Sequence, residues 1–436
     1  MAACYSLYRA LHVTETTTMR HEFFFLIKDR AALLWMTIAF ISAMMAVLLG
    51  VSEVYQQRTA LAELQKLDRV ERELTLDAQS DWGNAAYYTF HLTYDPPSDF
   101  AFAAFGERDV SPWKHRIRML ALEGQIYETD ADNPDFALIG RFDYSFVAAL
   151  LTPLLIILLL YDLRSGELAA GRLNLIKTSA GQAKRVWLMR STLRLGGLYL
   201  ALLTPLWIGG VIEGTPTSTL LSASLALLIY TLFWGALVYL IANERRTGSA
   251  NLTYLTGIWL LVCAVLPALL VLTVNKSVSL PNGGDIVLTQ REAVNDAWDI
   301  PKDVTYKAFL ERHPIWTDFT GWDGDKGFEW KWYYAFQQVG DQKAEALSQN
   351  YRKAREQRDA LIGKASFISP ASLLQRQLEK LAHTDMKASL AYEESIRDYH
   401  KQLRKWHYPR IFSNKPFSSD AALAEIPKYQ NVLERK

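Results

Sequence analysis

Five apolar stretches, each long enough to cross a lipid bilayer as a helix, constrain this 436-residue chain more than any other feature. They lie at residues 31–52, 144–161, 195–212, 220–242 and 252–274, and none contains Asp, Glu, Lys, Arg or His. At about 1.5 Å per residue, a helix of roughly 20 residues spans a hydrocarbon core of about 30 Å. The sequence therefore predicts an α-helical integral membrane protein with five transmembrane helices.

The charges between these stretches orient the helices. The loop at 162–194 carries seven Lys and Arg residues against Asp162 and Glu167, and the short loop at 243–251 contains Arg245 and Arg246. Short loops rich in Lys and Arg stay on the cytoplasmic side of a membrane. The N-terminus (1–30), whose segment HEFFFLIKDR suits an amphipathic helix in the headgroup layer, is then inside, and the C-terminus is outside.

Two long charged regions are left on the outer side, at 53–143 and 275–436. We expect them to form two external, mainly α-helical domains, with helices near 53–76, 338–362 and 372–408 and a short strand at 286–289. The net charge of +1 offers no basic stripe for nucleic acid. Only Cys4 and Cys263 are present, so no disulfide framework is expected.

No pattern in the sequence indicates an energy source or an active site within this chain. A glycine-rich loop that ends in Gly-Lys-Ser or Gly-Lys-Thr, the signature of many ATPases, is absent. The spans lack the ionisable residues that proton- or sodium-coupled carriers place inside the membrane. The carboxylates near 318–329 do not have the spacing of a calcium-binding EF-hand. We therefore expect no enzyme activity, cofactor or metal, and motion driven by another subunit.

The loop at 162–194 is the strongest candidate for a functional site. Its segment 165–176 has helical spacing and a partly apolar face, which suits an amphipathic element gripped by a partner. The residues expected at that interface are Glu167, Leu168, Gly171, Arg172, Leu173 and Ile176. The alternative is a solvated positive-inside loop that has no partner.

Two further sets of residues are weaker candidates. Pro153, Pro205 and Pro267 interrupt three of the spans, either as hinges or as local kinks common in membrane helices. An aromatic-rich zone at 313–336 is either an external contact patch or the core of its domain. Its candidate contact residues are Trp316, Trp322, Trp330 and Trp332.

The chain resembles the membrane subunits of ABC type-2 exporters, in particular a bacterial branch with large external insertions. The resemblance rests on HEFFFLIKDR before the first span and on RSGELAAGRLNLIKTSAGQAKRV after the second, where Glu167 and Gly171 match the coupling pattern ahead of Lys184 and Arg185. The external segments DWGNAAYYTFHLTYDPP and SFISPASLLQRQLEKLAHTD are also similar. The family norm is six spans, whereas this sequence predicts five.

The resemblance implies a permease subunit in the bacterial inner membrane, with its external domains in the periplasm. It would pair with a second permease copy or a paralogue and dock on a separate ABC ATPase subunit through the coupling loop. Export is the direction that the resemblance implies. The alternative from another class is a membrane-anchored interaction protein that does not transport anything and binds an envelope partner through its external regions.

Overall fold

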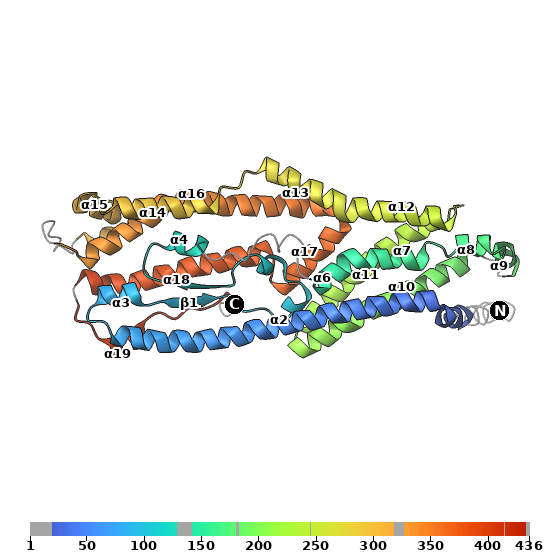
Figure 1. Cartoon of the computed structure of the whole chain (residues 1–436), viewed down its shortest axis with the longest axis horizontal. Helices are drawn as coiled ribbons and strands as arrows, with labels where there is room; N and C mark the ends of the chain where they lie inside the picture. The colour runs from blue at the N-terminus through green and yellow to red at the C-terminus, as the bar shows by residue number, and fades with distance from the viewer. Residues whose placement is uncertain are drawn as a thin grey trace, which may run out of the picture.

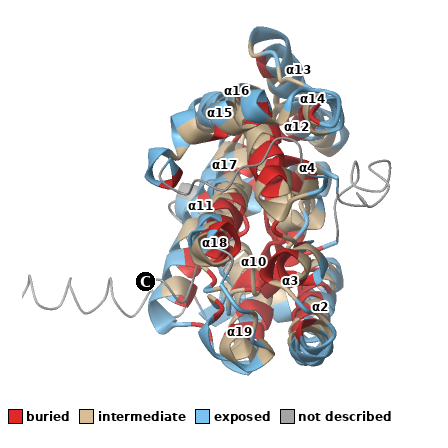
Figure 2. Ribbon diagram, turned by 90° about the vertical axis from the view of Figure 1, so that its left-hand side faces the viewer, coloured by how far each residue is buried: buried red, intermediate tan, exposed pale blue. Residues whose placement is uncertain are grey.

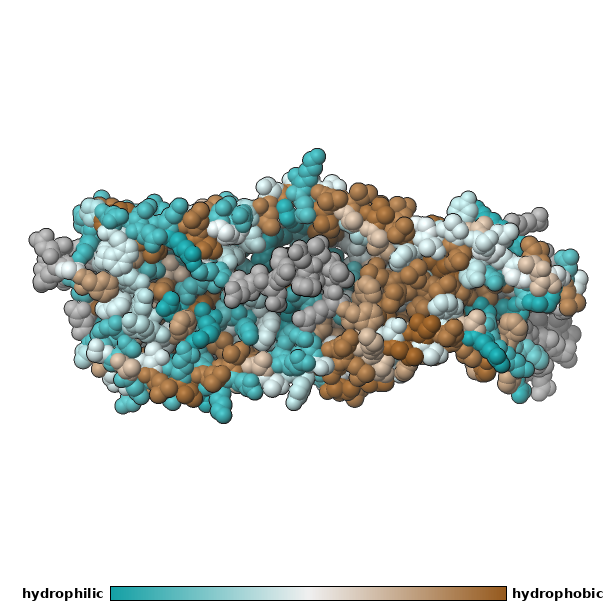
Figure 3. All heavy atoms as spheres, in the orientation of Figure 1, coloured by the Kyte–Doolittle hydropathy of each residue, from teal (hydrophilic) through white to brown (hydrophobic). Residues whose placement is uncertain are grey.

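The computed structural model describes residues 20–128, 142–179, 183–244, 246–317, 327–413 and 415–432. The molecule is an elongated bundle whose main helices run along its long axis (Figure 1). A band of apolar residues covers the surface on one side of the middle, and polar residues predominate towards both ends (Figure 3). Five of the described helices are long and apolar enough to cross a membrane, as the sequence predicts.

All five apolar stretches are helical. The first belongs to α2 (Arg30–Asp77), which continues without a break far beyond its apolar part. The second consists of α6 (Tyr144–Phe146), the π-helical turn η3 (Val147–Leu151) and α7 (Thr152–Leu160). The third and fourth are α10 (Ala183–Glu213) and α11 (Thr217–Ala242). The fifth consists of α12 (Gly248–Leu260), the π-helical turn η4 (Leu261–Val265) and α13 (Leu266–Ser277).

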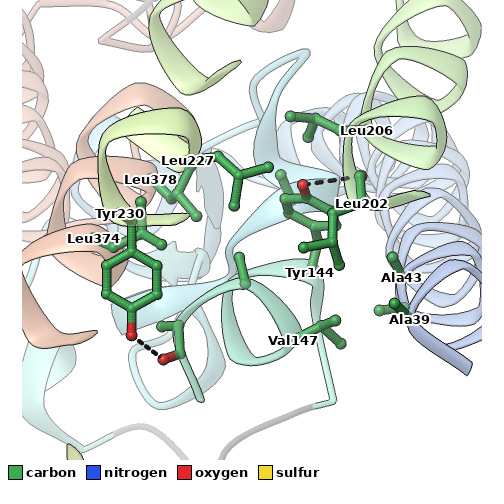
Figure 4. Close-up of a cluster of buried hydrophobic side chains, with 14 of the residues drawn as sticks. Ala39, Ala43, Tyr144, Val147, Leu202, Leu206, Leu227, Tyr230, Leu374 and Leu378 are labelled. Atoms are coloured by element: carbon green, nitrogen blue, oxygen red, sulfur yellow. Dashed lines mark hydrogen bonds between the residues drawn. The ribbon is translucent and has the colours of Figure 1, made fainter. Parts of the chain in front are cut away.

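A π-helical turn precedes the proline in both the second and the fifth span. Pro153 lacks the N–H that would bond to the carbonyl of Ala149, and the hydroxyl of Tyr230 on α11 donates to that carbonyl instead (Figure 4). Trp259 donates from Nε1 to the next carbonyl, that of Leu150, at 3.1 Å. Neighbouring helices thus satisfy the backbone groups that the irregular turn leaves free, as the interior of a membrane requires.

Two glycines allow close contacts with α2, one made by the third span and the other by the segment around Phe102. A Cβ at Gly209 on α10 would lie 2.6 Å from Cγ1 of Val47 on α2, well inside van der Waals contact. A Cβ at Gly50 would lie 2.1 Å from the backbone oxygen of Phe102. The segment around Phe102 therefore packs directly against α2.

The region after α2 contains short elements. These are α3 (Trp82–Tyr88), β1 (His91–Tyr94), the 3-10 turns η1 (Ala101–Ala103) and η2 (Gly106–Asp109), β2 (Lys114–Ile117) and α4 (Leu122–Tyr127). Strands β1 and β2 form an antiparallel pair in which His91 lies opposite Ile117.

The C-terminal region is helical. It contains α14 (Gly283–Asp296), α15 (Lys302–Arg312), η5 (Pro314–Trp316), α16 (Trp330–Ala365), η6 (Ser366–Ile368), α17 (Pro370–Ala382), α18 (Met386–Phe412) and α19 (Ser419–Glu425). The strand predicted at 286–289 is wrong, because Asn282 caps a helix that covers these residues. The single helix predicted at 372–408 is two helices, because His383 adopts a left-handed conformation (φ 54°) and Asp385 caps α18.

The two regions that the sequence predicts to be external domains share a hydrophobic core in the structure. Trp82, Ile117 and Leu122 from the first region pack in the same cluster as Phe309, Tyr334 and Tyr399 from the second. Part of the apolar surface of each region is buried against the other. We call the resulting unit, residues 53–128 and 278–432, the polar domain.

Helix α17 joins the polar domain to the spans. Its Leu374 and Leu378 pack with Leu227 and Tyr230 of the fourth span (Figure 4). The segment around η1 is buried in the same cluster. In the end view of Figure 2, buried residues lie towards the interior, between the helices that surround them.

Four buried histidines, His91, His115, His400 and His407, connect the two strands with α18. Burial lowers the pKa of His115 to about 4 and that of His407 to about 3. Neither ring nitrogen of His407 has a hydrogen-bond partner among the described residues. These imidazoles are therefore neutral in the folded protein at pH 7.

The polar domain should become less stable as the pH falls below about 6.5. The unfolded chain then takes up protons that the folded chain excludes, which costs about 1.4 kcal/mol per pH unit for each histidine until its folded pKa is reached. We expect His407→Leu to weaken the pH dependence of the free energy of unfolding between pH 7.5 and 5, measured by denaturant titration of the full chain in detergent. Identical slopes for wild type and His407→Leu would contradict a neutral buried His407.

Candidate functional site

The loop between the second and third spans lies at the end of the molecule opposite the polar domain (Figure 1). It contains the short helices α8 (Ser165–Ala169) and α9 (Leu173–Ser179). The continuous helical segment predicted over 165–176 is wrong, because Gly171 has a φ of +72° and ends the first helix. A left-handed residue at this position turns the chain between α8 and α9.

Glu167 is the centre of a charged network. Its carboxylate is buried and accepts hydrogen bonds from Nε of Arg172 at 2.7 Å and from Nη1 of Arg190 at 3.0 Å. Arg172 lies just beyond the turn at Gly171, whereas Arg190 is in the first turns of α10. Glu167 thus fastens the loop to the third span.

The same arginine reaches the N-terminal helix at 20–28. Arg190 donates from Nε to Glu22 Oε2 at 2.6 Å, and its guanidinium lies over the ring of Phe25. One turn further along α10, Arg194 donates to Asp29 Oδ2 at 2.5 Å and to the carbonyl of Leu159 at 2.6 Å. The loop, the third span and the start of the first span are therefore held together by ion pairs that are mostly shielded from water.

The six residues predicted at the interface divide into two groups. Glu167 and Leu173 are buried and hold the loop in place. Leu168, Gly171 and Arg172 are exposed, and Ile176 is half-buried. Leu175, which the sequence analysis did not select, is also exposed, so the accessible surface combines leucines with the Arg172 guanidinium.

A charged cleft of about 340 Å³ opens beside this network. It is bounded by the N-terminal helix, the inner end of α7 and the start of α10, with carboxylates and guanidinium groups in its walls. The loop at 243–251 lies next to the same region. Its Asn251 donates a hydrogen bond from Nδ2 to the carbonyl of Tyr161 at 3.1 Å. The start of α12 is thus fixed to the end of α7.

The site also includes Glu22, Asp29, Arg190 and Arg194, which no sequence pattern singled out. Glu22 and Arg190 are 168 residues apart, and Asp29 and Arg194 are 165 residues apart. No local spacing joins such pairs. The only signals of these contacts in the sequence were the basic character of the loop and the charged segment before the first span.

The predicted hinges differ in their local structure. Pro153 and Pro267 each follow a π-helical turn, so the helix is already irregular at both positions. Pro205 lies inside α10. π-Helical turns occur frequently at functional sites, which singles out the second and fifth spans as the places where bending would be easiest.

The predicted aromatic contact patch is mostly interior. Trp316 and Trp332 are buried, and Trp330 packs against the core of the polar domain. Trp332 contacts the ring of Phe336, and Trp316 stacks on Phe412. Trp322 lies outside the described residues. The alternative interpretation, a domain core, fits these three tryptophans.

Candidate metal ligands are scattered over the described part of the chain. There, no group of three or more His, Cys, Asp or Glu side chains is arranged to hold a metal ion. Cys263 is a free, buried thiol in the fifth span.

Comparison with known proteins gives a match only in the polar domain. Residues 286–431 match a family described as a domain of unknown function, DUF3526. This part of the chain runs from α14 to beyond α19 and contains none of the five candidate spans. No curated protein matches the sequence. No solved structure matches it either.

Proposed function

We propose that this chain is the permease subunit of an ATP-driven ABC transporter, an exporter of the bacterial inner membrane whose ATPase is a separate chain. The observation that carries the proposal is the ion-paired connection of the loop at 165–179 to both the third span and the start of the first. A partner that pushed on α8 would move α10 and α2 together, because Arg190 and Arg194 link them. A solvated loop without a partner would need no such connection.

The exposed residues of the loop support docking to a protein. Leu168 and Leu175 present apolar side chains beside Arg172, and the buried Glu167 fixes the geometry behind them. Interfaces commonly combine an apolar centre with polar groups at the rim. In this proposal the loop faces the cytoplasm, as its positive charge favours, and the polar domain lies in the periplasm.

Co-purification in mild detergent from native membranes tests the proposal. We expect a nucleotide-binding subunit with ATPase activity to elute with the tagged wild-type chain. Gly171→Trp should abolish this association, because the Cβ direction at Gly171 is open and a large side chain there would stand in the docking surface. Gly171→Asn is the matched control, since asparagine tolerates the left-handed conformation and remains small.

The asparagine variant keeps the left-handed turn, whereas tryptophan adds both bulk and backbone strain at a φ of +72°. Both should insert in the membrane as the wild type does, and only the tryptophan variant should lose the ATPase. If the wild-type chain elutes without any ATPase, the permease proposal fails, and an anchor for envelope interactions becomes the better interpretation. If Gly171→Trp retains the ATPase, the coupling assignment of the loop fails.

A further inference from the structure

The outer half of α2 leaves an apolar stripe uncovered. Leu67, Val70 and Leu74 are 63%, 47% and 68% exposed, and their spacing of three and four residues places them on one face of the helix. Tyr88 of α3 borders this face, which forms an open groove of about 630 Å³. Figure 3 shows apolar residues at the lower edge of the polar end, where the outer half of α2 runs. We call Leu67, Val70 and Leu74 the α2 stripe.

Lipid does not cover the α2 stripe. The apolar part of α2 ends near Ser52, so Leu67 and Leu74 lie roughly 22 Å and 33 Å further along the helix at about 1.5 Å per residue. A hydrocarbon core of about 30 Å that surrounds the apolar part does not extend to them. Exposed apolar residues need no partner inside a bilayer, but a contiguous patch in water marks an interaction surface.

We infer that the α2 stripe packs against the same stripe of a second copy of this chain. Two copies in one membrane have parallel α2 helices, and their stripes lie at the same height. A two-fold axis along the membrane normal therefore brings the stripes together in register, without any adjustment along the helix. Helix α2 lies at the edge of the molecule, where another helix can reach it (Figures 1 and 2).

The charges beside the stripe suit a parallel pair. If Leu67 and Leu74 occupy equivalent positions of a heptad, Lys66 of one copy faces Glu71 of the other across the seam. Within one chain Glu71 accepts from Arg116 at 2.6 Å, and Lys66 forms no ion pair among the described residues. The pairing would therefore place the ammonium group of Lys66 from one copy beside the Glu71 carboxylate of the other.

The same face of α2 continues towards the membrane. Ile38, Met45 and Leu49 are exposed, and Leu49 lies five full helical turns before Leu67. The α2 stripe alone is short for a stable dimer, and a contact that continues along this face would enlarge it. The inference rests on the proposed function in one respect, since a permease of this type works as a pair.

Cysteine cross-linking in native membranes tests the inference. The background is the full-length chain with Cys4→Ser and Cys263→Ser, expressed as two differently tagged copies. Val70→Cys and Leu74→Cys should each yield a cross-linked product that carries both tags after treatment with a short bis-maleimide. Arg69→Cys is the matched control, because it is exposed on another side of α2 and should yield several-fold less product.

Each outcome decides a different point. A product with both tags from Val70→Cys and Leu74→Cys, and little from Arg69→Cys, supports the stripe as a self-interface. A product that joins the tagged chain to a different polypeptide overturns the second copy as the occupant. Equal products at all three positions, or none, overturn the stripe as an interface. Co-purification of the ATPase with the same tagged chain tests the proposed function separately. Its outcome does not depend on the cross-linking result.

Discussion

Replacing Arg190 with glutamine should release the N-terminal helix from the rest of the molecule. The guanidinium of Arg190 bridges Glu22 and Glu167, and all three side chains are largely shielded from water. Removing the cation leaves two carboxylates close together and without their shared partner. Breaking a buried ion pair by removing one partner costs about 3–5 kcal/mol, so the contact should be lost rather than weakened.

Hydrogen exchange measures this effect directly. Amides of residues 20–28 and 165–169 should exchange faster in Arg190→Gln than in the wild type, and co-purification of the ATPase should decline. Arg190→Lys is the informative control, because one ammonium group cannot reproduce the two-sided contact of a guanidinium. Unchanged exchange at both segments in Arg190→Gln would contradict the role given to this residue.

The second large effect concerns the centre of the polar domain. Glu123 on α4 accepts from Arg397 on α18 at 2.8 and 2.9 Å and from Ser348 on α16 at 2.7 Å. Burial alone would raise the pKa of Glu123, but the hydrogen bonds from Arg397 and Ser348 outweigh it and hold the pKa below its usual value. The pair joins the region after the first span to two helices of the C-terminal region.

Arg397→Met should lower the free energy of unfolding of the polar domain by about 3–5 kcal/mol, because it leaves the Glu123 carboxylate buried without its cation. The double variant Glu123→Leu with Arg397→Met should recover part of this loss, since it removes both charges. Denaturant titration monitored by tryptophan fluorescence measures the differences.

An exposed ion pair serves as the comparison. Arg312 and Glu345 lie 3.0 Å apart at the surface, and Glu345→Gln should change the stability by less than about 1 kcal/mol. A loss of similar size in Glu345→Gln and Arg397→Met would mean that burial does not control the strength of these pairs.

The sequence by itself determined the five helices that can cross a membrane and the place of the basic loop between two of them. Both follow from local composition, because uncharged stretches of this length can hide their backbone polar groups only as helices. It also predicted the helical continuation of α2 beyond the first span and the helical character of most of the C-terminal region. Local errors arose where the backbone conformation of one residue ends a helix. Gly171 and His383 adopt left-handed conformations there, and periodicity alone would extend the helix past them.

Only the tertiary structure decided how distant segments combine. The shared core of the polar domain joins residues on either side of four spans, and Trp82 and Tyr399 gave no local sign of their common cluster. The same holds for Arg190, whose partner Glu22 lies 168 residues before it in the chain. The physical reason is that an ion pair or a buried contact depends on distance in space, whereas periodicity and composition report only on neighbours along the helix. The apolar stripe on α2 became visible for the same reason: its residues fit any amphipathic helix until the fold leaves them uncovered.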